Sequence, residues 1–510
     1  MASIETTPVP KGEAGVSFPE GVGSKSSPGN FPGGMRRRAA GLFAANILTM
    51  LVVGFSFLVY SRLLSPPEFG LYAAALSAAT LLSLILDGGL KTSIIKMEAE
   101  LAKEEESSIA LLMLTVSIVL ILFLLLAQQP LLSRHSEIKH DAKFISLFVG
   151  IALVFYPFVT LPTAKLERRL EYGHIAWIES AGMILERAAP ALLLIWTRAG
   201  LYSFIWALLF SRVFRALVLA KFHAIDLWSA SPTALKASFG LLREGGWIQF
   251  GTISAVVRDN LHTLLVGPLF GKEWIGYYAW VLQVCLISSQ IFSQISARVS
   301  LPLFAQADSF EERWSRCLYQ VRVLAMLTIP VLCGVWLVLP TVDNHFFHGK
   351  WHQALVLVPF LFLRMVPGLA TTPLGPLIMV HKGGRAYASV NALWTATEIG
   401  GACVCLFFIG PTGLAWSYVV MVWLGLWLLI RSLGRPSSNL AAQLTQELWR
   451  RPSLIFALSA ALVVTAVAKN ISLVLFDPKS IIAVACVLIL ISYTLEPELR
   501  RFLVHAKTKI

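Results

Sequence analysis

The chain has 510 residues, of which 56% are hydrophobic and 14% charged, and its formal net charge is +13. A soluble protein carries about 25% charged residues, so this composition excludes a soluble enzyme or binding module and predicts a protein embedded in lipid. The positive charge is expected to face anionic lipids. Nucleic acid is excluded as a partner, because the sequence has no soluble domain in which basic and aromatic residues cluster.

Residues 1–38 are rich in Pro, Gly and Ser, show no hydrophobic period and end in three arginines. We therefore expect a disordered cytoplasmic tail. The apolar run that follows is long enough to span a membrane and has no small-residue cleavage site, so we expect a retained first helix and no cleaved signal peptide.

Apolar runs of about 20 residues, the length that crosses the hydrocarbon layer, recur about fourteen times along the chain. We therefore predict an all-α polytopic membrane protein. Residues 39–223 and 247–435 would each form a bundle of six helices, and residues 453–510 would form a C-terminal helical hairpin with a basic tail. The expected spans are 40–61, 70–90, 109–128, 144–162, 175–196, 202–222, 247–269, 276–300, 319–340, 354–378, 388–409, 413–433, 453–475 and 480–496.

A short motif at the start of the second span recurs in mid-chain. Gly70-Leu71-Tyr72-Ala73 opens an apolar run after a turn, and Gly276-Tyr277-Tyr278-Ala279 does the same at an offset (276 minus 70) of 206 residues. About six membrane helices fit in this offset, and an even number of crossings leaves both halves in the same orientation. The repeat predicts two bundles in a pseudo-two-fold relation, as in transporters that open alternately to each side.

The loops carry their basic residues unevenly. With the N-terminus in the cytoplasm, about thirty of the 42 Lys and Arg fall on the cytoplasmic side, so we expect both termini there. Residues 224–246 form the longest internal connection, and its apolar residues Leu235, Phe239 and Leu242 recur at helical spacing. This pattern predicts an amphipathic linker on the inner membrane surface, placed to let the bundles rock, although a simple tether would have the same pattern. Residues 436–452 are expected to form another cytoplasmic loop.

Catalytic and cofactor motifs are missing from the sequence. The loops are too short for a soluble catalytic domain, and no Walker loop, Rossmann fingerprint or cluster of metal ligands occurs. The six cysteines have neither a disulfide framework nor zinc-ligand spacing. We expect a protein that is not an enzyme, binds no cofactor or metal, and uses an ion gradient or the substrate gradient for any transport.

Ionisable residues inside the spans are the best site candidates, because each costs about 2.5–3.5 kcal/mol at the centre of a membrane helix. Arg364 lies in a span that Pro367, Pro373 and Pro376 interrupt, which predicts a broken helix. Its guanidinium is expected either to contact an anion in a lumen or to pair with an acid on another helix, for instance Glu398.

Three ionisable residues share the seventh span. Asp259 and His262 are i, i+3 neighbours, and Arg258 and His262 are i, i+4 neighbours on one helix face. A His–Asp pair in a membrane can relay a proton and so couple transport. A structural hydrogen-bonded cluster between helices explains the same residues equally well.

The fifth span carries Glu179, Glu186 and Arg187, and the two glutamates lie seven residues apart on one face. The favoured interpretation is an internal salt-bridge network with Arg187.

Two other charged sites lie at span ends in the first half. Asp87 and Lys91, at i, i+4 spacing, are expected to pair with each other. Arg62 would either extend to the membrane interface or line the outer mouth of a lumen.

Short motifs lie in five segments, which in order are Arg62–Ala73, Leu86–Leu90, Lys165–Tyr172, Gly271–Tyr278 and Phe347–Trp351. They resemble motifs of the oligosaccharide (O-antigen) flippase family, within the multidrug/oligosaccharidyl-lipid/polysaccharide exporter superfamily. The resemblance covers about residues 36–435. Lys272 departs from it, since proline is usual there, and so does Pro268, where arginine is common.

The resemblance implies translocation of an undecaprenyl-pyrophosphate-linked oligosaccharide across the bacterial cytoplasmic (inner) membrane, by alternating access, for exopolysaccharide, O-antigen or capsule biosynthesis. Expected partners are the lipid-linked oligosaccharide, membrane lipids, H⁺ or Na⁺, and a polysaccharide polymerase and glycosyltransferases. A diphosphate carries roughly two negative charges, which suits arginines at membrane depth. The expected lumen contacts for the pyrophosphate and glycan are Arg364, Arg258, Arg62 and Arg187. The expected ion-coupling residues are Asp259, His262, Glu398, Asp87 and Glu179.

Two alternatives stay open. An ion-coupled drug or cation antiporter of the same superfamily would use the membrane acids as its main contacts. A membrane glycan polymerase or ligase would need a sizeable outward loop with catalytic residues, and the longest outward loops, Gln129–Lys143 and Pro340–Gln353, look too short for one.

Overall fold

The computed structural model describes residue 49, residues 51–96 and residues 102–449, apart from 133–135, 170, 198–199 and 435–436. Its regular elements over these ranges are all helical. Eight of the described helices are long and apolar enough to cross a membrane, so the protein is an all-helical, multi-pass membrane protein. The expected tail and C-terminal hairpin lie outside the described residues, and the total of about fourteen helices stays a prediction.

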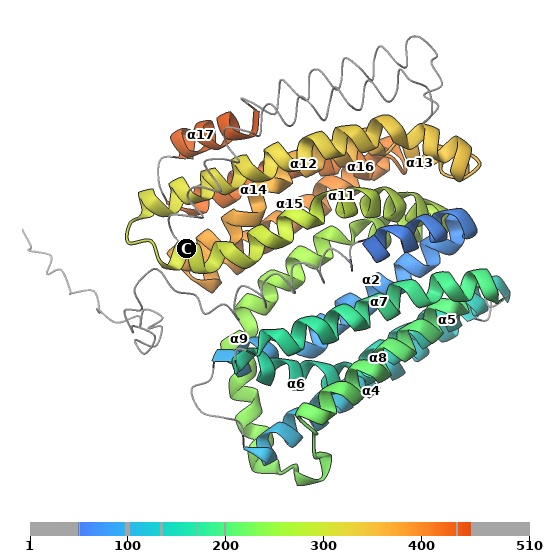
Figure 1. The fold of residues 1–510 in the computed structure, drawn as a ribbon, viewed down its shortest axis with the longest axis vertical. Coiled ribbons are helices and arrows are strands. Elements are labelled where there is room, and N and C mark those ends of the chain that lie inside the picture. The colour runs from blue at the N-terminus through green and yellow to red at the C-terminus, as the bar shows by residue number, and fades with distance from the viewer. Residues whose placement is uncertain are drawn as a thin grey trace, which may run out of the picture.

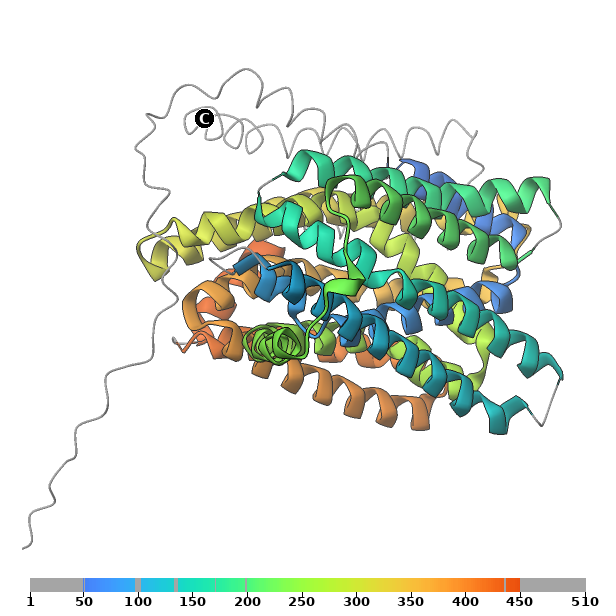
Figure 2. The same ribbon diagram turned by 90° about the horizontal axis from the view of Figure 1, so that it is seen from below.

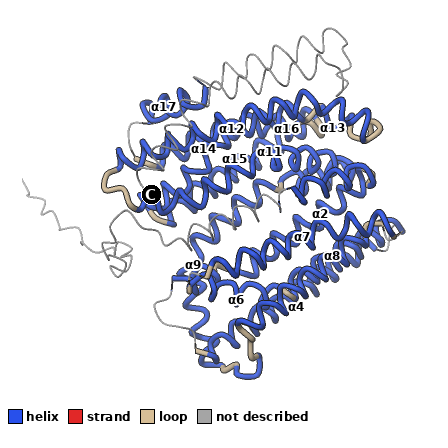
Figure 3. The backbone as a smooth tube through the Cα atoms, viewed as in Figure 1, coloured by secondary structure: helices blue, strands red, loops and turns tan. Residues whose placement is uncertain are grey.

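The described helices form two groups, which we call the first and second lobes (Figure 1). Helices in both lobes run roughly parallel, and the loops gather at the two ends of the molecule (Figures 2 and 3). The first lobe contains the helix Leu51–Leu63, α2 (Pro66–Asp87), α3 (Leu90–Lys96), α4 (Lys103–Leu132), α5 (Ser136–Val154), α6 (Tyr156–Arg168), α7 (Tyr172–Trp196) and α8 (Tyr202–Phe222). The second lobe contains α9 (Pro232–Asp259), the π-helical turn η3 (His262–Val266), α10 (Gly267–Phe270), α11 (Lys272–Ala305), α12 (Phe310–Phe346), α13 (His352–Leu355), α14 (Val358–Lys382), α15 (Gly384–Ile409), α16 (Gly413–Ser432) and α17 (Ser437–Trp449).

The repeated motif forms the contact between the lobes, where α2 packs against α11. A Cβ atom on Gly70 would lie 1.8 Å from the Lys272 carbonyl oxygen, and one on Gly276 would lie 2.0 Å from the Pro66 carbonyl oxygen. Pro66 precedes Gly70 by four residues, as Lys272 precedes Gly276, so the contact is locally two-fold. Only glycine lets the two backbones approach this closely.

The start of α2 is fixed by its own sequence. Glu68 accepts hydrogen bonds from the Ser65 backbone N–H at 2.8 Å and from the Ser65 hydroxyl at 2.7 Å. Pro66 occupies the first turn, where a missing N–H costs nothing. These local signals place Gly70 one turn into the helix, facing α11.

The end of the molecule at which Gly70 and Gly276 meet is called the closed end here. Buried aromatic residues stabilise it. The rings of Trp280 and Trp351 stack with their centroids 4.9 Å apart. Their indole N–H groups donate to the Ser61 hydroxyl at 2.8 Å and to the Ser61 carbonyl at 2.9 Å, respectively. The Lys272 ammonium adds an ion pair with Asp141 of α5 at 2.8 Å. The first helix, α11 and the residue that caps α13 are therefore tied together beside the glycine contact.

The prediction of a broken helix around Arg364 is wrong, because α14 runs without interruption from Val358 to Lys382 with three prolines inside it. Pro367 and Pro373 are buried against other helices. Prolines are tolerated within membrane helices where neighbouring protein satisfies the carbonyl groups that they leave free.

Two expected connections contain helical structure. The linker 224–246 is not separated from the seventh span, because the helix α9 begins at Pro232 within the linker and continues into that span. Figure 1 shows the first half of α9 crossing one end of the molecule, and α9 contacts α3 and α4 of the first lobe and α15 of the second. The expected loop 436–452 contains α17, whose Leu440, Leu444 and Leu448 are buried in the second lobe.

The glycine contact predicts a stability difference. Replacing glycine by alanine inside a helix normally stabilises it by about 1 kcal/mol, but at Gly70 or Gly276 the added methyl group meets backbone and the lobes must separate. We expect Gly70→Ala and Gly276→Ala each to lower the free energy of unfolding by about 1–3 kcal/mol, measured as a lower midpoint in thermal unfolding of the purified protein. Gly150→Ala, where a Cβ meets nothing within 4 Å, is the matched control. Equal midpoints for all three variants would contradict the contact.

Candidate functional site

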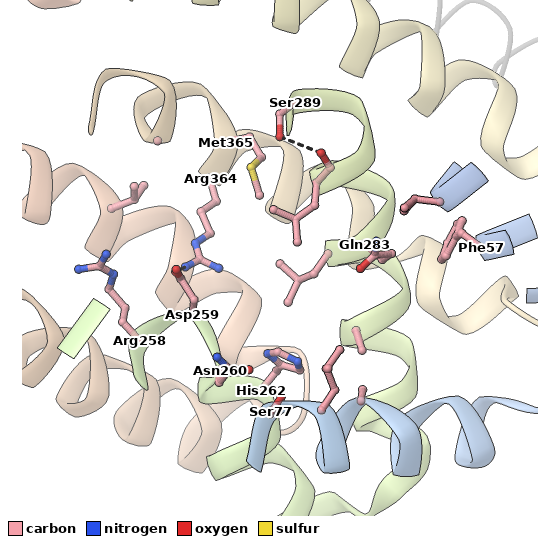
Figure 4. Close-up of a pocket in the computed structure, with 18 of the residues that line it drawn as sticks. Phe57, Ser77, Arg258, Asp259, Asn260, His262, Gln283, Ser289, Arg364 and Met365 are labelled. Atoms are coloured by element: carbon pink, nitrogen blue, oxygen red, sulfur yellow. Dashed lines mark hydrogen bonds and ion pairs between the residues drawn. The ribbon is translucent and has the colours of Figure 1, made fainter. Parts of the chain in front are cut away.

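A cavity of about 470 Å³ lies between the lobes, within the size range of small-ligand sites. We call it the central chamber (Figure 4). Its walls come from the first helix, α2 and α7 on one side and from α9, η3, α11, α14, α15 and α16 on the other. The structure brings five predicted site residues together in its lining, namely Arg187, Arg258, Asp259, His262 and Arg364.

Arg364 of α14 both faces the chamber and pairs with acids of other helices. Its Nη2 atom lies 3.0 Å from Asp259 Oδ1 and 3.9 Å from Glu398 Oε1, and the two side chains Arg364 and Asp259 point toward one another in Figure 4. The guanidinium also lies over the Tyr418 ring, 3.8 Å from its centroid. The expected pairing of Arg364 with an acid on another helix is confirmed, with Asp259 as the direct partner and Glu398 farther away, and the expected contact with an anion stays a prediction.

Arg258, the last basic residue of α9, reaches α15. Its guanidinium lies 3.7 Å from the ring centroid of Trp394, and its Nε is 3.9 Å from Glu398 Oε2. Its Nη1 donates to Asn391 at 3.4 Å. Glu398 is 1% exposed and accepts no hydrogen bond within the described residues, so it balances both arginines through charge alone.

The helix break that places these groups is not evident in the sequence. Instead of a continuous span over 247–269, α9 ends at Asp259 and the π-helical turn η3 follows. The Asn260 side chain donates to the Val256 carbonyl at 2.8 Å, which helps to close the helix end. Thr263 then reaches Ser77 of α2, with 3.2 Å between the hydroxyl oxygens. Single π-helical turns are frequent at functional sites.

The expected His262–Asp259 relay pair is not formed. The Asp259 carboxylate bonds to Arg364, and the Nδ1 atom of His262 has no hydrogen-bond partner among the described residues. The reason is geometric, because the i, i+3 relation holds for a continuous α-helix and the chain leaves that geometry after Asp259.

The first lobe contributes Arg187 of α7. Its Nη1 donates to the Tyr72 hydroxyl at 3.0 Å, and its carbonyl accepts a hydrogen bond from Tyr60. Tyr60 and Tyr72 also line the chamber. Arg187 is thus held on the wall opposite the Arg258–Arg364 cluster.

The expected salt-bridge network in the first lobe exists with a different arginine. Arg215 of α8 lies 3.5 Å from Glu179 and 3.5 Å from Glu186, so the prediction that Arg187 forms these bridges is wrong. Arg215 lies inside the span 202–222, and the same search for charges inside spans would have found it. Neither glutamate lines the chamber.

Asp87, Lys91 and Arg62 lie away from the chamber lining. Lys91 pairs with Glu167 of α6 at 2.9 Å, so the expected pair with Asp87 is wrong. The cause is Gly88, whose left-handed φ of 53° ends α2 and removes the helical i, i+4 relation. Arg62 is exposed and lies over the Phe346 ring, 4.9 Å from its centroid.

Several polar and aromatic residues of the site were not singled out from the sequence. They share a position against a site arginine or on the chamber wall: Tyr60, Tyr72, Asn260, Asn391, Trp394 and Tyr418. Tyr72 belongs to the repeated motif, which was a usable signal. The others depend on packing between distant helices.

The fold and the chamber together define a two-lobed, all-helical membrane protein with an arginine-lined central site, an architecture used by transporters. The chain belongs to a family described as polysaccharide biosynthesis proteins, whose model matches residues 59–356.

Two named relatives are similar over about two thirds of the chain. The lipopolysaccharide biosynthesis protein WzxC of Escherichia coli (strain K12) is 23% identical over 350 residues, which cover 65% of this chain and 68% of WzxC. The teichuronic acid biosynthesis protein TuaB of Bacillus subtilis (strain 168) is 22% identical over 366 residues, or 68% of this chain and 72% of TuaB.

Solved structures share the fold at low identity. The lipid II flippase MurJ in an inward closed conformation superposes with a TM-score of 0.69 at 12% identity, over 90% of this chain and 99% of that one. An inward-facing multidrug resistance transporter of the MATE family gives a TM-score of 0.56 at 15% identity, over 77% of this chain and 95% of that one.

The network around Arg215 predicts a large stability effect. Arg215→Met removes the cation that lies 3.5 Å from both Glu179 and Glu186 and leaves Arg212 as the basic residue near them, so we expect a loss of about 1–3 kcal/mol in the free energy of unfolding, seen in thermal unfolding. Adding Glu186→Gln to Arg215→Met is expected to restore part of the loss, because one uncompensated charge is removed. Strict additivity of the two substitutions would argue against the network.

Proposed function

We propose that this protein is a flippase that moves an undecaprenyl-pyrophosphate-linked oligosaccharide across the bacterial cytoplasmic membrane for surface polysaccharide biosynthesis. The observation that carries the proposal is the set of arginines from both lobes, Arg187, Arg258 and Arg364, around one chamber at membrane depth. Family membership and the names of relatives in lipopolysaccharide and teichuronic acid biosynthesis support it.

The chemistry of the chamber suits a diphosphate. Guanidinium groups present several N–H donors in a plane and bind phosphate oxygens in pairs. Stacking on Trp394 and Tyr418 holds the two planes from their faces and leaves donor edges available. A cavity of about 470 Å³ accommodates a headgroup, so the lipid chain would remain in the bilayer and the sugars would extend toward the open side.

The contacts at the closed end support a mechanism of alternating access, because they must open for the substrate to leave. With the N-terminus in the cytoplasm, the starts of α2 and α11 lie at the outer surface, so the glycine contact and the Lys272–Asp141 ion pair close the chamber to the outside. Release of the substrate outward then requires α2 and α11 to separate while the lobes rock about α9. Both termini would be cytoplasmic, near the glycosyltransferases that make the substrate and opposite the side of the polymerase.

Coupling to H⁺ or Na⁺ belongs to the same proposal. Glu398 is the strongest candidate for such a proton, because it lies 3.9 Å from both arginines with no hydrogen bond from the described residues. The acids also keep an antiporter for drugs or cations as the second candidate function. In that case Asp259 and Glu398, and not the arginines, would be the residues that transport cannot lose.

Removal of the protein tests the function directly. In a deletion strain we expect the lipid-linked oligosaccharide to accumulate on the cytoplasmic leaflet and surface polysaccharide to fall, as measured by lipid extraction and surface labelling. Arg364→Ala is expected to reduce complementation at least about tenfold, because a charge-assisted contact with phosphate is lost. Glu447→Gln, which breaks an ion pair between α17 and Arg322 far from the chamber, should complement normally. Wild-type polysaccharide in the deletion strain would refute the proposal.

A cross-link across the closed end tests alternating access. In a cysteine-free background, Lys272→Cys with Asp141→Cys places one thiol on each lobe, and a cleavable bifunctional thiol reagent should stop transport until the linker is reduced. Lys91→Cys with Glu167→Cys replaces an ion pair of similar length within the first lobe and serves as the control, for which cross-linking should leave transport intact. Full transport with the inter-lobe cross-link in place would contradict the mechanism.

A further inference from the structure

The two acids of the arginine cluster differ in their freedom to move. The Asp259 side chain is 61% exposed to the chamber and bonds directly to Arg364 at 3.0 Å. The Glu398 side chain is 1% exposed and lies 3.9 Å from each of two arginines. One acid is therefore a direct, solvent-accessible partner, and the other is a buried carboxyl group behind the guanidinium groups.

We propose that Asp259 is a built-in competitor of the substrate: its carboxylate occupies Arg364 when no phosphate is bound, must be displaced when the diphosphate enters, and returns to Arg364 as the diphosphate leaves. This inference rests on the proposed function and adds a residue that sets both affinity and release.

The position of Asp259 favours such an exchange. It is the last residue of α9, and the π-helical turn begins three residues later at His262, so its side chain is not locked between α-helical neighbours on both sides. A negative charge at a helix C-terminus is also unfavourable, because the carbonyl ends carry partial negative charge. Arg364 compensates for that cost, and the pair holds only as long as nothing binds Arg364 better.

The remaining contacts of Arg364 do not change when Asp259 leaves. The Tyr418 ring supports the guanidinium from its face, and Glu398 stays close behind it. A phosphate oxygen that replaces Asp259 Oδ1 thus finds the donor already oriented, and little reorganisation is needed on binding.

The charges of the cluster favour first the binding of the diphosphate and then its release. Arg258 and Arg364 are matched by Asp259 and Glu398, so the cluster is formally neutral. When Asp259 swings into the watery chamber, the cluster offers a net positive charge to a diphosphate with roughly two negative charges. Return of Asp259 then opposes that anion by like charge, which favours release at the end of the cycle.

The test measures binding and transport separately in the full-length protein. The probe for binding is farnesyl diphosphate, with farnesol as the control for the lipid chain. We expect Asp259→Asn and Asp259→Ala to bind the diphosphate about tenfold more tightly than the wild type, while transport of the lipid-linked oligosaccharide in cells falls. Glu447→Gln, the ion-pair control, should change neither quantity.

Failure of the diphosphate site and failure of the competitor role of Asp259 give different results. If the wild type does not bind farnesyl diphosphate, or if Arg364→Ala binds it equally well, the proposed site fails. If the wild type binds and Arg364→Ala does not, but both Asp259 variants bind with equal or lower affinity, the competitor role is overturned and Asp259 only holds Arg364 in place. Tighter binding with unchanged transport would also overturn it, because release would then not depend on the carboxylate.

Discussion

The cost of an ionised group at membrane depth governs the arrangement of this molecule. Each such group must find a partner of opposite charge or water, and the two lobes meet that demand differently. In the first lobe Arg215 pairs with Glu179 and Glu186 within a bundle, and Arg212 is a second cation near them. In the second lobe Arg258 and Arg364 meet Asp259 and Glu398 at the edge of a cavity. The first arrangement stabilises a bundle, whereas the second leaves donors where a ligand can reach them.

The chamber is closed at one end by a direct backbone contact between the lobes. Backbone contact at Gly70 and Gly276 brings α2 and α11 together at the closed end, and the stacked indoles of Trp280 and Trp351 fill the space beside it. Farther along the same helices, Ser77 and Ser289 already face the cavity. A short, symmetric contact between repeated motifs thus sets the geometry of the site and supplies the element that must open in a transport cycle.

Sequence patterns predicted the helices well and their partners poorly, for physical reasons. The bilayer demands about 20 apolar residues per crossing, and the expected span 202–222 coincides with α8. Asp259 and Arg364 were recognised as candidates because their charge is costly in any membrane helix. Their pairing was missed, since it depends on where α9 ends and on how α14 packs. The continuity of α14 through three prolines was missed for a related reason: whether a freed carbonyl finds another partner is decided by neighbouring helices, and no local pattern records it.

A shared fold does not determine what the chamber binds, because one architecture can host different substrates. The chemistry of the chamber depends on the residues that line it. A site made only of arginines would bind a diphosphate too tightly to release it, and a site with every arginine neutralised by a buried acid would not bind it. Here one acid is buried and one is exposed, so the pair of arginines is partly compensated and partly available. Transport needs affinity that is sufficient for binding and weak enough for release, and a single carboxylate at a helix end that competes for the same guanidinium limits the affinity in this way while the lobes rock.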